Sequence, residues 1–271
     1  MIHESNPTEN ISLISHSAII PEIGTHKKHM HYTNELLLFI RGDASYMIDG
    51  NQFFLRPYDL LIIPKGIYHC VSVNSRDVYE NYVINFYDSI LPDDILNKVF
   101  SPPCVFNIKN DNNFLNLFES LDRVENTYTE QEQRISFECI LKEMLIYSCY
   151  YERISTPLIK TNNPYIEKAL NYISQNICEN INADSIAFEL KISASHLQNV
   201  FSEYMHIGLK QYIAQKKIIK AKEIIESGIS ANETALFLGF NDYSTFYRLF
   251  KKTVGISPSE SKKCRRNECI E

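Results

Sequence analysis

The sequence predicts an α+β protein of more than one domain, with a β-rich N-terminal part and an all-helical C-terminal part. Its 271 residues exceed the usual length of a single domain. Short runs rich in β-branched and aromatic residues continue to about residue 106, and from residue 112 onward the apolar positions follow a helical period. Charge divides in the same way, because residues 1–163 carry a net −8 and residues 164–271 a net +2.

The N-terminal part, residues 1–110, is predicted to be a β-sandwich or β-barrel of short strands. Asp49-Gly50 separates two β-rich runs, and Gly adopts positive φ without a Cβ clash, so we expect a two-residue hairpin turn there. The predicted strands are 11–20, 36–40, 44–48, 52–55, 60–63, 68–73 and 79–86.

Two amphipathic helices, near 111–127 and 130–153, are predicted to follow the strands. Such a pair typically covers the core, and the second helix is our candidate for contact between two copies of the chain. We therefore treat 111–153 as a dimerisation segment. Residues 154–163 are polar and punctuated by proline, a composition typical of a linker.

Residues 164–271 are predicted to be helical and to contain two copies of one motif. The junction at 184–201 recurs at 233–250, each with a small Ala, an apolar turn residue and a Ser that can accept bonds from N–H groups of the second helix. This pattern indicates two helix-turn-helix units joined by a long helix. The predicted helices are 164–178, 183–190, 194–204, 208–227, 231–238, 243–253 and 258–263.

The second copy carries a long signature, because residues 239–252 read GFNDYSTFYRLFKK. Together with the pattern over 165–263, this signature resembles the AraC family of bacterial transcription factors. The resemblance implies that two recognition helices, 193–204 and 243–253, lie in major-groove segments on one face of DNA. It also implies that the chain regulates transcription, as an activator, and is not an enzyme.

The recognition helices supply the candidate DNA contacts. In the second helix Phe246, Leu249 and Phe250 are expected to face the core. Arg248 is the best candidate for a base contact, since a guanidinium can bind guanine O6 and N7 together; a phosphate contact is the alternative. The full candidate set is Ser195, Gln198, Asn199, Tyr243, Ser244, Tyr247, Arg248, Lys251 and Lys252.

Positive charge is unequal between the two units. Residues 210–266 carry a net +7, which suits a polyanion, whereas the first recognition helix has Asn199 and Ser202-Glu203 where relatives commonly have Arg and Lys-Lys. We therefore expect a salt-dependent DNA affinity dominated by the second unit and the joining helix. The candidates for backbone contacts around the joining helix are Lys210, Lys216, Lys217, Lys220 and Lys222.

The N-terminal part carries a second resemblance. Segments 29–42 and 58–69 look like the two motifs of the cupin barrel, although Tyr58 replaces a customary Gly. In metal-binding cupins these motifs supply three His and one Glu to one ion, a set that suits Fe, Mn, Ni or Zn. Alternation along one strand predicts that both His of the first motif point the same way. The corresponding residues here are His29, His31, Glu35 and His69.

Three interpretations of this cluster stay open: a pocket for an organic effector, a divalent metal site, and a purely structural barrel. Our first hypothesis is a cytoplasmic, dimeric regulator whose barrel senses a small molecule, with double-stranded DNA and RNA polymerase as partners. The alternative is a metal-dependent cupin enzyme, or a metal sensor, with an accessory DNA-binding domain. No cofactor is expected apart from that candidate metal, and no apolar run is long enough to span a membrane.

Overall fold

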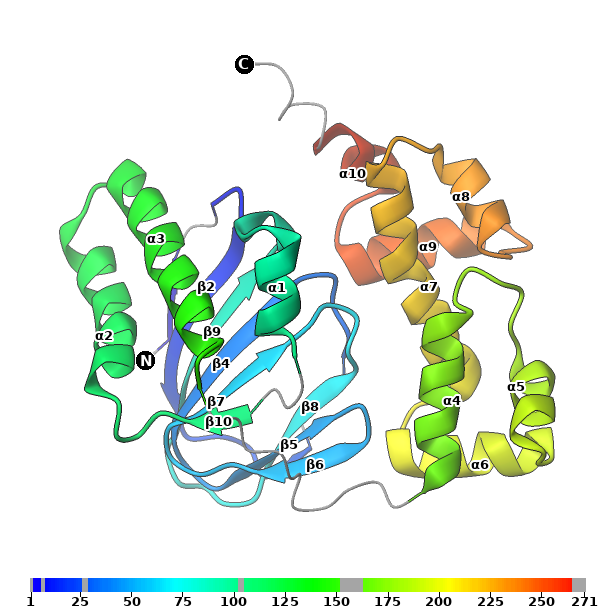
Figure 1. Ribbon diagram of the computed structural model, residues 1–271, viewed down its shortest axis with the longest axis horizontal. Helices are drawn as coiled ribbons and strands as arrows, with labels where there is room; N and C mark the ends of the chain where they lie inside the picture. The colour runs from blue at the N-terminus through cyan, green and yellow to red at the C-terminus, as the bar shows by residue number, and fades with distance from the viewer. Residues whose placement is uncertain (1, 6–7, 26–28, 102–104, 152–162, 265–271) are drawn as a thin grey trace. The chain divides into compact units, whose positions relative to one another are not determined.

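The computed structural model describes residues 2–5, 8–25, 29–101, 105–151 and 163–264. The chain forms two compact units, one centred on residues 1–158 and the other on residues 159–271. The first unit holds the sheets, and the described part of the second is helical (Figure 1). The predicted α+β class is therefore confirmed. Apart from Asn163, the predicted linker lies outside the described residues.

Two antiparallel sheets make up most of the first unit. Their strand orders are β1-β2-β9-β4-β7-β10 and β3-β8-β5-β6. Asp49 and Gly50 both have positive φ, 43° and 80°, and so form the predicted two-residue turn between β5 and β6. The strands are β1 (Ile2–Ser5), β2 (Ile11–Ile19), β3 (Gly24–Thr25), β4 (Asn34–Arg41), β5 (Ala44–Ile48), β6 (Asn51–Phe54), β7 (Asp59–Ile63), β8 (His69–Val73), β9 (Tyr79–Phe86) and β10 (Val105–Asn107).

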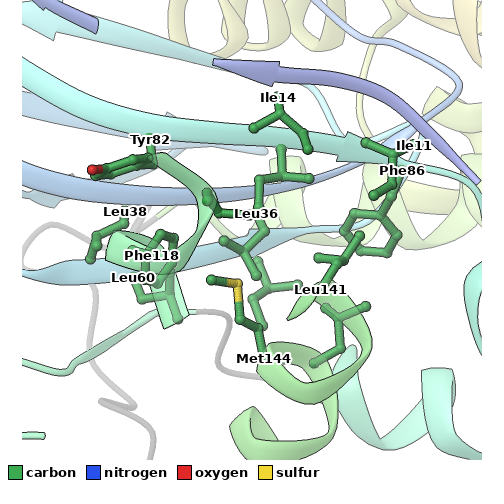
Figure 2. Packing of buried hydrophobic residues seen from close by; sticks show 14 of the residues in the cluster. Ile11, Ile14, Leu36, Leu38, Leu60, Tyr82, Phe86, Phe118, Leu141 and Met144 are labelled. Atoms are coloured by element: carbon green, nitrogen blue, oxygen red, sulfur yellow. The ribbon is translucent and has the colours of Figure 1, made fainter. Parts of the chain in front are cut away.

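The six-stranded sheet is covered on both faces, which explains why β4 is apolar along most of its length. On one face, Leu36 and Leu38 pack with buried residues of the helices that follow the barrel (Figure 2). On the other face, Leu37 and Phe39 pack with residues of the four-stranded sheet. Because side chains alternate along a strand, Glu35 shares this second face and is directed between the two sheets.

The helices of the first unit are α1 (Asp93–Val99), α2 (Asn112–Thr127) and α3 (Glu130–Ser148), with a short 3-10 helix η1 (Asp88–Ile90) before them. Asp111 caps α2 by accepting a hydrogen bond from the backbone N–H of Phe114 at 2.9 Å, and it also accepts from the hydroxyls of Tyr147 and Tyr151. Burial opposes ionisation of Asp111, but the hydrogen bonds from Tyr151, Phe114 and Tyr147 outweigh it and lower the pKa of the carboxyl.

The prediction for the second helix, 130–153, is too long. α3 ends at Ser148, because the next three residues bond three positions back rather than four, from Cys149 to Ile146 and from Tyr151 to Ser148 among them. Such tightening is a common way to end a helix. It leaves Tyr151 outside the helix, in contact with the Asp111 cap.

The second unit contains all seven predicted helices. Its core beneath α9 is formed by Phe246 and Phe250 together with Ile218, Ala221 and Ile225 of α7. None of the described helices is both long enough and apolar enough to cross a membrane. The helices are α4 (Pro164–Gln175), α5 (Ala183–Leu190), α6 (Ala194–Met205), α7 (Leu209–Glu226), α8 (Ala231–Phe237), α9 (Tyr243–Val254) and α10 (Pro258–Cys264).

Candidate DNA-binding surface and barrel site

The recognition helix of the second unit, α9, begins at an acidic cap. Asp242 accepts hydrogen bonds from the backbone N–H of Ser244 at 3.2 Å and of Thr245 at 2.7 Å. Hydrogen bonds from the Thr245 side chain and backbone are the largest causes of the lowered pKa of Asp242. The prediction that a Ser accepts these bonds is therefore wrong for the second helix-turn-helix unit. It is confirmed for the first, where Ser193 accepts from the N–H of His196 at 3.2 Å.

α9 has a core face and an exposed face. The three residues predicted to face the core are buried or half-buried, and Phe246 and Phe250 have no exposed surface. Arg248 is exposed, and its bonds to Ser244 O at 3.4 Å and Thr245 Oγ1 at 3.5 Å are at the long limit of hydrogen bonding. Its guanidinium is thus held only weakly by its own helix. The exposed candidates on α9 are Tyr243, Ser244, Tyr247, Arg248, Lys251 and Lys252.

α6 presents a similar exposed face in the first helix-turn-helix unit, but this helix carries no lysine or arginine. Ser195, Gln198 and Asn199 are exposed, while Leu197 and Phe201 are buried. All nine candidate DNA contacts therefore lie on solvent-exposed faces of the two recognition helices.

The two recognition helices end differently. α9 ends at Gly255, whose φ of 86° is readily adopted by glycine, whereas α6 ends at His206, which has a φ of 54°. A side chain in this left-handed region costs about 1–2 kcal/mol. His206 therefore adopts the same left-handed cap conformation as Gly255, but with added strain.

The lysines of the joining helix α7 do not form one uniform face. Lys217 is 6% exposed and donates a hydrogen bond to the carbonyl of Leu238 at 2.7 Å, so the prediction that it contacts DNA phosphates is wrong. Lys220 and Lys222 form ion pairs with glutamates of the same helix. Phosphate contacts remain a prediction for the four other lysines of the set, Lys210, Lys216, Lys220 and Lys222.

The structure brings together all four residues predicted for the barrel site. One ligating atom from each of His29, His31, Glu35 and His69 lies within 4.8 Å of all the others. His29 and His69 exchange backbone hydrogen bonds of 3.0 and 3.1 Å. The prediction that His29 and His31 lie on one strand is wrong, because His29 forms a single bridge to His69 and β4 begins only at Asn34.

Glu35 and His69 form the buried half of this cluster, with exposures of 4% and 0%. Tyr46 donates a hydrogen bond to Glu35 Oε1 at 3.1 Å. Burial first, and then the nearby Glu35 carboxylate, raise the pKa of the Tyr46 hydroxyl well above its usual value. The cluster is therefore anchored on the inner face of the barrel.

The protonation of His69 follows from its neighbours. Its Nδ1 lies 2.9 Å from the carbonyl oxygen of Ile67, which can only accept, so Nδ1 carries the proton in the neutral ring. Nε2, which then carries a lone pair, lies 3.6 Å from Glu35 Oε2. Both atoms carry lone pairs, so a cation bound between them would be attracted by both.

The donor set fits a divalent transition metal. Imidazole nitrogens and a carboxylate suit such ions, and bonds of about 2.0–2.2 Å keep ligating atoms within about 4.4 Å of each other. The observed spread of 4.8 Å requires an inward shift of a few tenths of an ångström. His29 is exposed and His31 half-buried, so their rings have room to move. The same polar groups can also hydrogen-bond an organic ligand.

Two contacts of these sites were not assigned from the sequence. Tyr46 lies in a correctly predicted strand, but nothing in the sequence pairs it with Glu35. Asp242 was detectable, because an Asp immediately before a helix is a common cap.

Comparisons with known proteins place both units in described families. Residues 10–141 match the family model of the AraC-like ligand binding domain, and residues 186–263 match that of a helix-turn-helix domain.

Two curated relatives and one solved structure illustrate the similarity. An uncharacterized HTH-type transcriptional regulator in the cgkA 5′ region of Pseudoalteromonas carrageenovora is 31% identical over 105 residues, which cover 39% of this chain and 63% of that protein. The melibiose operon regulatory protein of Escherichia coli K12 is 29% identical over 100 residues, covering 36% and 33%. The matched stretch is less than two thirds of either relative. The crystal structure of ToxT from Vibrio cholerae O395 is 16% identical with a TM-score of 0.40, covering 93% of this chain and 97% of that one.

Proposed function

This chain belongs to the AraC-type family of helix-turn-helix transcriptional regulators, and from this premise we propose that it binds specific DNA sequences and activates transcription in response to a small molecule held in its barrel. The proposal includes a cytoplasmic location, where its DNA lies, and RNA polymerase as a partner of the activator. The observation that carries it is the pair of exposed polar faces on α6 and α9.

The exposed face of α9 supports both affinity and sequence reading. Lys251 and Lys252 are exposed in the last part of the helix, where a phosphate backbone can accept their charge. Arg248 lies one turn earlier and is only weakly held by its helix. We assign the lysines to phosphates and Arg248 to a guanine edge, because a guanidinium matches O6 and N7.

Replacing Arg248 with Ala tests the assignment. A duplex enriched from a random library by the wild-type chain serves as the operator. We expect the variant to bind it about 1–3 kcal/mol more weakly, with little change on unrelated DNA, because a base contact discriminates between sequences. Affinities are measured by fluorescence anisotropy at several salt concentrations.

The matched control is Lys168→Ala, which removes one positive charge from an exposed position of α4. Its affinity for the operator should stay near that of the wild type. An equal loss on operator and unrelated DNA for Arg248→Ala would move this residue to the phosphate contacts. A wild-type chain that enriches no sequence would contradict the proposed function itself.

We place the effector at the His29, His31, Glu35 and His69 cluster. Buried Glu35 and the Tyr46 hydroxyl supply fixed polar groups at its inner side, while exposed His29 and half-buried His31 lie toward solvent. Apolar side chains fill the adjacent space between the sheets. This arrangement suits a small polar ligand, since few well-placed polar groups in an apolar surround give orientation and specificity.

We propose that two copies associate through α3. Ile135 and Ile146 of this helix are 62% and 42% exposed, and Tyr150 just after it is 82% exposed. Ile146 and Tyr150 also line a groove of about 780 Å³ between α2 and α3, together with Leu117. Apolar surface of this kind is stabilised by burial in an interface, and a second copy presents the same surface.

A second candidate function is metal sensing at the same cluster, favoured by the four ligating atoms within 4.8 Å. The bound ion would supply positive charge between Nε2 of His69 and the Glu35 carboxylate. We favour sensing over a metal enzyme because the family consists of regulators.

Metal analysis of protein purified without a histidine tag or chelator separates the two candidates. If the cluster holds an ion, we expect about one equivalent of a divalent transition metal, and its loss when His29 and His31 are both replaced by Ala. The variant should retain wild-type circular dichroism, because His29 is exposed and His31 only half-buried. Metal-free wild-type protein that still binds operator DNA would remove the metal candidate and leave the organic effector.

A further inference from the structure

Lys217 is a buried cation in the middle of α7. Its side chain is 6% exposed, and its Nζ donates a hydrogen bond to the carbonyl oxygen of Leu238 at 2.7 Å. Burial lowers the pKa of the ammonium, and nearby Cys178 opposes this shift. Leu238 is the C-cap of α8, where helix carbonyls carry partial negative charge. This acceptor offsets part of the cost of burying a charge.

Lys217 separates two packing zones along α7. Before it, Tyr212 packs on Phe201 of α6, with ring centroids 5.3 Å apart. After it, Ile218 joins the core cluster that contains Phe246 of α9. α7 thus contacts α6 of the first helix-turn-helix unit and both helices of the second. The separation between the two units is set along this helix.

A third segment meets the same point. Gly239 follows the α8 cap with a φ of 74°, and a Cβ built on it would lie 3.5 Å from both Lys217 Nζ and Asn180 Oδ1. Asn180 precedes α5 and belongs to the first helix-turn-helix unit, whereas Gly239 begins the turn of the second helix-turn-helix unit. The Lys217 side chain therefore fills a junction at which segments of both units approach each other.

We propose that Lys217 is a positioning residue that fixes the separation of α6 and α9, and thereby the spacing between the two DNA segments that the protein accepts. This inference rests on the proposed function. The bond to Leu238 holds the end of α8, and α9 follows it after a short turn. Without that bond, the apolar contacts that hold the second unit to α7 are non-directional and allow sliding.

The test uses the full chain and the operator enriched by the wild type. Duplexes are made with one base pair added or removed between the two contacted segments, which shifts one segment by about 3.4 Å. We expect the wild type to lose at least about 10-fold in affinity with each change, because the base contacts of one unit are displaced. For Lys217→Met, which keeps length but removes the charge, this ratio should fall below about 3-fold.

Lys210→Met is the matched control, because it removes an exposed lysine from the same helix. It should keep the wild-type spacing ratio, even if its affinity falls equally on all duplexes. The salt dependence of binding should be unchanged in Lys217→Met, since Lys217 does not contact phosphate. Lys217→Gln, which retains a donor, is measured beside it, and folding is checked by thermal melting.

Each of the following results would overturn the inference that Lys217 fixes the spacing. A folded Lys217→Met with the wild-type spacing ratio overturns the inference while leaving the proposed function intact. If neither variant folds, Lys217 serves folding rather than spacing, and the inference is overturned. An operator contacted by one unit alone also overturns it. A wild type that enriches no DNA removes the proposed function and this inference together.

Discussion

Replacing Phe246 with Ala is expected to destabilise the second helix-turn-helix unit by about 3–5 kcal/mol, the usual cost of emptying a buried aromatic site. Phe246 has no exposed surface, and its ring centroid lies 5.2 Å from that of Phe240 and 5.7 Å from that of Phe250. The cavity would lie directly beneath α9. Since domains are stable by only about 5–15 kcal/mol, operator binding should be largely lost.

Urea denaturation followed by circular dichroism at 222 nm measures the change. Phe237→Ala is the matched control, since the same side chain is 61% exposed on α8. It should change the free energy of unfolding by no more than about 0.5 kcal/mol. Similar losses for the two variants would contradict the assignment of the core face of α9.

Replacing Phe114 with Ala is expected to destabilise the N-terminal unit, which holds the sheets, by a similar amount, about 3–5 kcal/mol. Phe114 is fully buried and is the centre of an aromatic cluster. Its ring centroid lies 5.3 Å from Tyr147, 5.6 Å from Tyr151 and 6.1 Å from Phe118. Its loss removes contacts that join α2 to α3 and also loosens the residues around the Asp111 cap.

The same denaturation experiment applies, with Phe54→Ala as the control, because Phe54 of β6 is 44% exposed. We expect the control to unfold close to the wild-type midpoint. A Phe114→Ala midpoint equal to that of Phe54→Ala would show that the aromatic cluster contributes little to stability.

Local signals in the sequence were sufficient where one short segment decides the structure. Asp49-Gly50 specifies a turn because few residues accept positive φ. The helical period around Phe246 and Phe250 identifies the buried face of α9, and thereby the exposed candidates on its opposite side. In both places the information lies within about one helical turn or one hairpin.

Elements that depend on distant partners were not predictable. β10 has three residues and exists because Phe106 pairs with Leu60 of β7. Lys217 shows the same limit within the site. An amphipathic helix with many lysines gives no local sign that one of them is buried against a carbonyl of α8.

The barrel cluster lies between these cases. Its residue types and spacing were sufficient to predict that His29, His31, Glu35 and His69 meet. Their backbone was not predictable, because an isolated bridge between His29 and His69 replaces the expected strand. The motif is sufficient to identify which residues meet, whereas the positions of their side chains depend on how the loop returns to the sheet.

The unequal ends of the recognition helices have a consequence for how DNA is engaged. The second helix ends in Gly255 without strain, whereas the first carries the cost of His206 in a left-handed conformation. Local opening begins where stability is lowest, so we expect the C-terminal end of the first recognition helix to open more readily than that of the second. We expect the second recognition helix, whose last turn carries Lys251 and Lys252, to anchor the protein on an operator. We expect the first, which carries no lysine or arginine, to adapt to variation in its half of the target.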